Sequence, residues 1–376
     1  MPPAVSICLP NLNTRPYLKE RFESIFSQTF RDWELFVYDS FSDDGSWEFI
    51  QQVAPQDERV RIAQGPREGV YPAWNECIRQ TKGEYVYIAT SDDSMAPDFL
   101  EKMVAALQQH QECALAHSRL VITSETGEDY KDASWPDCTV FADGIREMVD
   151  TPHVRRAPYD GLIQLTGRHT VLSITQLLIR RSIFDRVGYF PDRWGSQSDF
   201  NWEMKAGLLT NAVYVPGTWA TWRIHANQST HDARELSLDA YFGKVELMIR
   251  DAVAECQKEL HPAIVRELQA KLLDDTHQLR MYYMTLRQLR DDKVGRSLYQ
   301  LKRILSGPSV VRRELGRRIL GRSKWADRAA PEIRVGLESL GLQPITPCLP
   351  GMVSGEGAGD RVAGAAGNRD IPVSNT

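Results

Sequence analysis

Three groups of carboxylates stand where strands of this sequence are expected to end. Asp39 closes one short apolar run, the pair Asp92 and Asp93 follows another at 85–89, and Asp199 lies beside two aromatic residues. A carboxylate at a strand end can accept hydrogen bonds from a ribose or a base. Adjacent carboxylates repel each other, and a divalent cation removes that penalty, so the pair indicates a metal site.

Each of these groups also has a simple structural interpretation. Asp39 and the pair Asp92 and Asp93 could cap the helices that follow them, and Asp199 could interact with the dipole of a helix first turn. The apolar neighbours Phe200 and Trp202 would instead raise the pKa of Asp199 and suit it to general-base work. The local sequence leaves both interpretations open.

The elements expected to position these residues form an α/β fold. The first hundred residues alternate short apolar runs with amphipathic stretches, which is typical of a mostly parallel sheet covered by helices. The expected strands are 4–9, 34–39, 60–63 and 84–90, and the expected helices are 17–28, 71–81 and 97–110. Ligands of open α/β sheets bind beyond the carboxyl ends of the strands, where Asp39, Asp92 and Asp93 are placed.

The pattern changes twice after this first part. From about 112 to 230 it is mixed, with expected strands at 174–179, 212–215 and 221–225. After 235 the apolar spacing becomes helical, and it predicts a separate helical region at 231–343 with long helices at 238–259, 262–289 and 293–305. The remaining segment, 344–376, ends in a stretch rich in Gly, Ala and polar residues and is predicted to be a disordered tail.

Composition excludes several classes of protein. The chain has 376 residues, of which 42% are hydrophobic and 25% charged, so it is neither collagen, coiled coil nor wholly disordered. A net charge of −5 does not favour a nucleic-acid partner. The six cysteines are widely spread without a C-x-x-C pair and are expected to be reduced thiols. The start lacks a leader pattern and no apolar run reaches about 18 residues, so a cytoplasmic location is expected.

The ordered set of motifs resembles family 2 glycosyltransferases of the GT-A fold over about residues 4–230. The matching segments are 5–13, 24–30, Asp39 with its loop, 69–75, 91–93, 178–184, 187–190 and 223–225. The resemblance implies a mostly parallel, mixed sheet flanked by helices, followed by a helical C-terminal appendage. It places a catalytic domain at 1–230, with a nucleotide-sugar half at about 1–111 and an acceptor half at about 112–230.

The resemblance also implies roles for individual residues. Asp199 would be the base of an inverting displacement, and Asp92, Asp93 and His225 would hold Mn²⁺ or Mg²⁺. The expected nucleotide-sugar contacts are Pro10, Asn11, Asn13, Asp39, Arg67, Gly69, Asn75 and Asp92. Gln176, Trp194 and Trp202 are candidates for the acceptor site, with packing or a sheet-face position as the alternative for each.

The implied function is transfer of a sugar from a nucleoside-diphosphate sugar, UDP-sugar by default, to a hydroxyl of a glycan or lipid-linked saccharide. Two residues depart from the family pattern: Thr90 stands where an acid is usual, and Ser198 replaces the first acid of an acidic pair. These departures keep open a catalytically silent sugar-binding or scaffold protein. A sugar nucleotidyltransferase is a further alternative, but it should carry a Gly-rich basic loop where residues 11–14 stand.

A basic segment lies within the predicted helical region. Residues 302–328 contain nine basic and two acidic residues interleaved with apolar ones. This pattern fits peripheral contact with the inner face of an anionic membrane, where lipid-linked acceptors reside. The alternative is a solvated helix face packed on the core.

Overall fold

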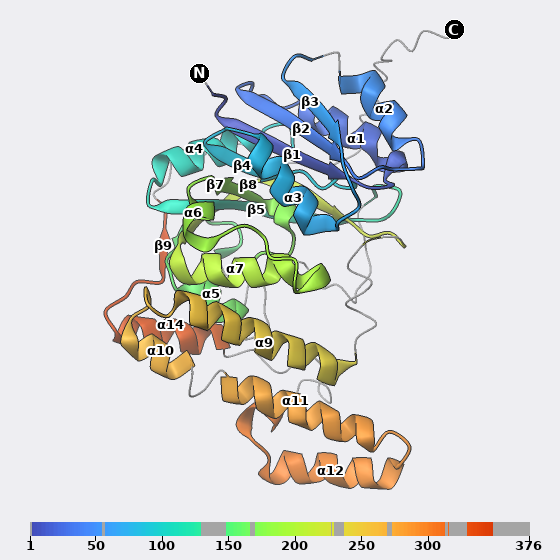
Figure 1. Cartoon of the computed structure of the whole chain (residues 1–376). Helices are drawn as coiled ribbons and strands as arrows, with labels where there is room; N and C mark the ends of the chain where they lie inside the picture. Colours follow the sequence, from blue (N-terminus) through green and yellow to red (C-terminus); the bar gives the residue numbers. More distant parts are fainter. Residues whose placement is uncertain are drawn as a thin grey trace.

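The computed structural model describes residues 2–54, 57–128, 148–165, 170–226, 228, 237–268, 273–312, 315 and 329–348. These residues contain one mixed sheet of nine strands in the order β3-β2-β1-β4-β7-β5-β8-β6-β9 (Figure 1). The strands are β1 (Val5–Asn11), β2 (Trp33–Asp39), β3 (Val60–Gln64), β4 (Tyr85–Ile88), β5 (Cys113–Thr123), β6 (His153–Arg155), β7 (Leu177–Arg180), β8 (Asn211–Arg223) and β9 (Ile345–Pro347).

The first four strands form a parallel half that confirms the expected α/β pattern. β1 pairs in parallel with β2 and β4, and β2 pairs in parallel with β3. β7 runs antiparallel to both β4 and β5, which makes the whole sheet mixed. Because parallel strands share a direction, the loops after β1, β2, β3 and β4 gather at one edge of the sheet.

Helices cover both faces of the sheet because its strands are apolar on both sides. The helices are α1 (Arg15–Phe26), α2 (Ser46–Val53), α3 (Val70–Gln80), α4 (Phe99–Gln109), α5 (Tyr159–Gln164), α6 (Ile183–Val187), α7 (Ser198–Leu209), α9 (Leu238–Cys256), α10 (Pro262–Glu267), α11 (Leu273–Gln288), α12 (Lys293–Ser306) and α14 (Ala329–Ser339). In β1, Val5, Ile7 and Leu9 join the core under α1, α2 and α4, whereas Cys8 joins the core under α3, α5, α6 and α7.

Two predicted strands differ from the structure. The expected strand at 174–179 begins as a 3₁₀ turn, Ile174–Gln176, because the Ser173 side chain caps that turn before β7 starts. The expected strands 212–215 and 221–225 belong to one strand, β8, which pairs along nearly its whole length with β5 and changes register between Ser118 and Arg119. The predicted helix 262–289 contains α10 and α11, separated by residues outside the described ranges.

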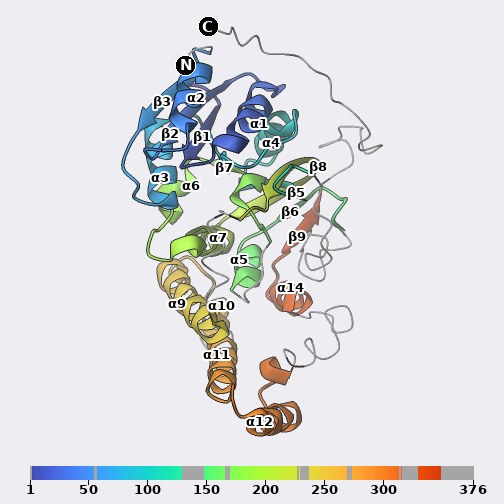
Figure 2. The ribbon, with the colours of Figure 1, turned by 90° about the vertical axis from the view of Figure 1, so that its right-hand side faces the viewer.

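The predicted boundary near residue 230 does not coincide with an end of the core. Val245, Met248 and Ile249 of α9 are buried in the same hydrophobic cluster as Trp202 of α7, so the first long helix of the expected appendage completes the main core. α11 and α12 project beyond it (Figures 1 and 2). A second, smaller cluster joins α11 to Val311 and Leu315, with Phe242 of α9 and Tyr299 of α12 packed against it.

The predicted disordered tail begins too early at 344. Ile345–Pro347 forms β9, which pairs antiparallel with β6 because the edge of that strand offers free backbone groups. Residues 349–376 lie outside the described ranges.

Free thiols occur at Cys8, Cys77, Cys113, Cys256 and Cys348, as expected, and Cys138 is among the residues not described. Among the helices in the described part of the chain, none combines the length and apolar character needed to cross a bilayer.

Candidate active site

Asn11 and Asp39 face each other at the carboxyl ends of β1 and β2. Asn11 Nδ2 donates to Asp39 Oδ1 at 2.6 Å. The same carboxylate accepts from Ser42 Oγ at 2.6 Å, from Ser42 N at 3.0 Å and from Gln64 Nε2 at 3.0 Å. Asp39 is fully buried, so it organises the loop after β2. A nucleotide base could contact Asp39 directly only if one of these donors gave up its hydrogen bond to the carboxylate. This predicted contact stays a prediction.

The loops after β1, β2 and β3 meet in a polar rim made by Asn13, Asp43 and Arg67. Asn13 Nδ2 donates to Asp43 Oδ1 at 2.8 Å, and Asp43 N donates back to Asn13 Oδ1 at 2.9 Å. Arg67 pairs with Asp43 at 3.0 Å, and its guanidinium is nearly half exposed. The structure therefore brings two predicted contact residues together and adds Asp43, which the sequence reasoning had not singled out.

Phe41 is a second rim residue that the sequence reasoning missed. Its side chain is 52% exposed and its φ is +48°, a left-handed conformation that is uncommon for an aromatic residue. Arg67 holds that conformation by donating to the Phe41 carbonyl at 2.5 Å. The rim therefore contains an exposed aromatic residue and a half-exposed guanidinium, two groups that are suited to binding a nucleoside. Pro10, also predicted to line the site, is buried within β1 instead.

The adjacent acids Asp92 and Asp93 occupy different environments. Asp92 Oδ2 lies 2.9 Å from His225 Nε2, and the Asp92 side chain is 23% exposed. Asp93 is turned inward, where its oxygens accept from Thr90 Oγ1 at 2.5 Å and from Arg223 N at 2.7 Å. Burial, with the neighbouring Asp92 charge, raises the pKa of Asp93 to about 8. Each oxygen of Asp93 already accepts a hydrogen bond from the protein, so the role of Asp93 as a metal ligand stays a prediction.

Asp92 and His225 together fit part of a divalent-cation site. A carboxylate oxygen and an imidazole nitrogen 2.9 Å apart can be neighbouring ligands of one ion, and this donor pair suits Mn²⁺. Within the described ranges no group of three His, Cys, Asp or Glu residues could hold a metal. An ion here would therefore take its other ligands from a bound diphosphate and water.

The same corner of the site is packed against α1. The Tyr17 ring lies 4.9 Å from the His225 ring, centroid to centroid, and Thr14 donates to Asn11 Oδ1 at 2.5 Å. The start of α1 therefore links the Asp92 and His225 pair to the Asn11 and Asp39 pair. Asn11 and Asp39 end β1 and β2, whereas Asp92 and His225 follow β4 and β8, so four strand ends meet at one edge of the sheet.

Asp199 lies at the start of α7 and contacts the start of α3. Tyr71 Oη donates to Asp199 Oδ1 at 3.1 Å, and Phe200 N donates to the same oxygen at 2.8 Å. Burial raises the pKa of Asp199, while these two hydrogen bonds limit the rise. Tyr71 stands two residues after Gly69, whose φ of +116° favours glycine. The loop that carries Arg67 therefore runs into the first turn of α3, which contacts Asp199 through Tyr71.

Comparison with known proteins shows which family the N-terminal half of the chain resembles. Residues 6–188 match the model of the family described as glycosyl transferase family 2. This segment of the chain belongs to glycosyl transferase family 2. Similar curated proteins include a putative teichuronic acid biosynthesis glycosyltransferase, TuaG, of Bacillus subtilis, which is 26% identical over 149 residues, covering 39% of this chain and 59% of TuaG. GlyG, a glycosyltransferase of Streptococcus pneumoniae, is 35% identical over 28% of this chain and 35% of its own length.

The chain therefore spans less than two thirds of the length of these relatives.

Solved structures resemble a larger part of this chain than these relatives do. Residues 1–349 of S. aureus TarS in complex with UDP-GlcNAc superpose with a TM-score of 0.54 and 16% identity, covering 88% of this chain and 92% of that one. The Pyrobaculum calidifontis mannosyltransferase PcManGT, in complex with GDP-Man and Mn²⁺, superposes with a TM-score of 0.51 and 15% identity. This match covers 88% of this chain and 87% of PcManGT. At these identities the likeness shows the fold, which is the GT-A fold.

Two predicted sugar contacts of the family 2 segment are used inside the protein. Asn75 Nδ2 donates to the Phe190 carbonyl at 2.8 Å, and Phe190 N donates to Asn75 Oδ1 at 3.1 Å. Gln176 Nε2 donates to the Ser118 carbonyl at 2.9 Å, while its Oε1 accepts from Leu172 N at 2.9 Å. Both predictions are corrected, because buried backbone groups take up both ends of each amide.

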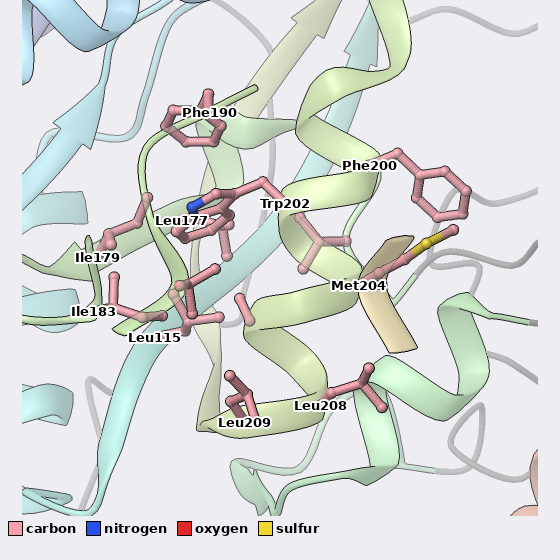
Figure 3. Close-up of a cluster of buried hydrophobic side chains, with 14 of the residues drawn as sticks. Leu115, Leu177, Ile179, Ile183, Phe190, Phe200, Trp202, Met204, Leu208 and Leu209 are labelled. Atoms are coloured by element: carbon pink, nitrogen blue, oxygen red, sulfur yellow. The ribbon is translucent and has the colours of Figure 1, made fainter. Parts of the chain in front are cut away.

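The two tryptophans predicted for the acceptor site differ in burial. Trp202 has no exposed surface and donates its indole N–H to the Gly188 carbonyl at 2.8 Å. Its ring packs 4.8 Å from that of Phe190 within the hydrophobic cluster (Figure 3), so its predicted role is wrong. Trp194 is half-buried near the start of α7, and its indole nitrogen has no hydrogen-bond partner among the described residues. A role for Trp194 in acceptor binding stays a prediction.

Proposed function

We propose that the protein transfers a sugar from a nucleoside-diphosphate sugar, UDP-sugar by default, to a hydroxyl of a glycan or lipid-linked saccharide. The observation that carries the proposal is the placement of three local contacts after the carboxyl ends of parallel strands: Arg67 with Asp43, Asp92 with His225, and Tyr71 with Asp199. The relatives' names support a polysaccharide acceptor, and the TarS complex supports UDP-GlcNAc as a donor to test. A cytoplasmic location is part of the proposal.

The rim and the acidic pair would hold the donor. Arg67 and the exposed Phe41 ring would bind the nucleotide, and Asp92 with His225 would hold Mn²⁺ or Mg²⁺ beside the diphosphate. When bound, such an ion offsets the negative charge that develops on the departing nucleoside diphosphate.

Asp199 would act as the general base. Its raised pKa strengthens it as a proton acceptor, and the hydrogen bond from Tyr71 fixes its Oδ1. Asp199 would take the proton of the acceptor hydroxyl as that oxygen attacks the anomeric carbon. A single displacement of this kind inverts the anomeric configuration.

The two departures from the family pattern have structural roles that are compatible with activity. Thr90 donates to Asp93, where an acid would instead repel a buried carboxylate. Ser198 Oγ accepts from Trp194 N at 3.2 Å and so helps to start α7. Neither substitution removes Asp92, His225 or Asp199, which favours an active enzyme over a silent binding protein.

The decisive experiment measures nucleotide release and donor-induced thermal stabilisation for UDP- and GDP-sugars with Mn²⁺. Asp92→Asn should abolish the Mn²⁺-dependent part of the stabilisation. Asp199→Asn should keep it but lower the rate of transfer by on the order of a hundredfold or more. Asp185→Asn, an exposed acid of α6, is the control and should change neither quantity. If no donor stabilises the wild-type protein or is turned over, the proposed function is wrong.

A further inference from the structure

The helix α12 is oriented with its apolar side away from the protein. Its inward side carries Tyr299, whose ring lies 6.0 Å from that of Tyr282 in α11, and the half-buried Arg303. The side opposite to Tyr299 carries Val294, Leu298, Leu301 and Leu305, whose residue surfaces are 71%, 62%, 52% and 73% exposed. This spacing places all four on one stripe of the helix. A helix that only packs on its own protein turns such a stripe inward.

Charge on α12 is of one sign. The helix contains Lys293, Arg296, Lys302 and Arg303 and no acidic residue, and its N-cap Asp292 is engaged by Gly295 N at 2.8 Å. By helical spacing, Lys293 and Lys302 stand on the two borders of the apolar stripe. Lysines in these positions can bury their carbon chains along an apolar surface while their ammonium groups reach anionic groups.

The predicted basic segment 302–328 begins inside α12, at Lys302, and two of its later apolar residues are buried. Val311 and Leu315 are only 1% and 2% exposed and pack with Tyr282 and Leu286 of α11. These apolar side chains hold α11 in place and are unavailable to a membrane. Residues 313, 314 and 316–328 lie outside the described ranges. Among the described residues of this segment, the exposed large apolar side chains, Ile304 and Leu305, belong to α12.

We propose that α12 lies flat on an anionic lipid bilayer, with Val294, Leu298, Leu301 and Leu305 inserted between the headgroups. An apolar stripe bordered by lysines has the chemistry that such a surface binds. Pairing of α12 with a second copy fits less well, because about two heptads are too short for a stable coiled coil and the helix carries only positive charge. In both ribbon views α12 lies at the end of the molecule far from β1, β2 and β3, so this contact leaves their strand ends uncovered (Figures 1 and 2).

Vesicle co-sedimentation of the full chain tests the proposal without using enzymatic activity. Wild-type protein should sediment with vesicles of phosphatidylglycerol and phosphatidylcholine and much less with phosphatidylcholine alone. The double variant Leu298→Gln, Leu305→Gln should lose at least about tenfold in partitioning, because two apolar side chains no longer insert. Lys293→Gln and Lys302→Gln should each lose roughly fivefold, on anionic vesicles only.

The matched control is Val335→Gln, which changes an apolar side chain of α14 that is 63% exposed and should leave sedimentation unchanged. Because all the substituted side chains are exposed, thermal melting of every variant should match the wild type. The proposal is overturned if the wild type ignores anionic vesicles, or if the control loses binding as strongly as the double variant. It is also overturned if the double variant only converts a dimer to a monomer in analytical ultracentrifugation, since α12 would then bind a second copy.

Discussion

At the scale of single residues, burial separates carboxylates that look alike in sequence. Asp92 and Asp93 are neighbours, yet one is partly exposed beside His225 and the other is held inside by Thr90 and the Arg223 backbone. Their positions at a strand end are predictable, because an apolar run precedes them. Which of the two points outward depends on the path of β8, more than a hundred residues later.

Tyr71→Phe tests how Asp199 is tuned. Burial raises the pKa of Asp199 and the Tyr71 hydrogen bond lowers it, so removing the hydroxyl should raise that pKa further. A base works only when ionised, so the acid limb of the pH profile of kcat/KM should move to higher pH, with the rate restored on the alkaline side. Tyr189→Phe, at an exposed tyrosine, is the control. An equal loss of rate at every pH would contradict this role for Tyr71.

At the scale of elements, a close helix crossing fixes the helix that carries Asp199. A Cβ on Gly207 of α7 would lie 2.5 Å from the backbone nitrogen of Gly161 in α5, and a Cβ on Gly161 would lie 2.4 Å from Leu208 N. The two helices approach closely because both residues lack side chains. The start of α7, with Asp199, is positioned by this contact as well as by Tyr71.

Gly207→Ala should therefore destabilise the protein by about 1–3 kcal/mol, despite the higher helix propensity of alanine. The control is Gly336→Ala in α14, where an added Cβ meets nothing within 4 Å and should stabilise by up to about 1 kcal/mol. Urea unfolding of both variants gives the two values. Equal effects in the two helices would show that the crossing at Gly207 tolerates a methyl group.

In the whole molecule, segments that are distant in sequence complete the hydrophobic core and the sheet. α9 buries Met248 and Ile249 in the core beneath α7, and β9 extends the sheet at β6. Arg156 N donates to the Pro344 carbonyl at 2.8 Å and Cys348 N to that of Pro152 at 2.9 Å, so the C-terminal strand is tied to the sheet at both ends.

Thr346→Pro tests the contribution of β9. Thr346 pairs with Val154 midway between those two hydrogen bonds, so by the alternation of an antiparallel ladder its N–H donates to β6. Proline removes that donor and should cost roughly 1–3 kcal/mol of unfolding free energy. Thr346→Ala keeps the N–H and should cost little, because the Thr346 hydroxyl is buried without a partner among the described residues. Similar melting temperatures for both variants would mean that β9 contributes little.

The α/β pattern, the strand ends where polar side chains gather and the ordered motifs of glycosyl transferase family 2 can all be recognised in the amino-acid sequence. These signals are local, because alternation and loop composition depend on neighbouring residues. Three features depend on the folded chain: the inward orientation of Asp93, Asn75, Gln176 and Trp202, the pairing of β9 with the sheet, and the outward apolar side of α12. Burial and pairing depend on which distant segment lies alongside, and no local pattern carries that information.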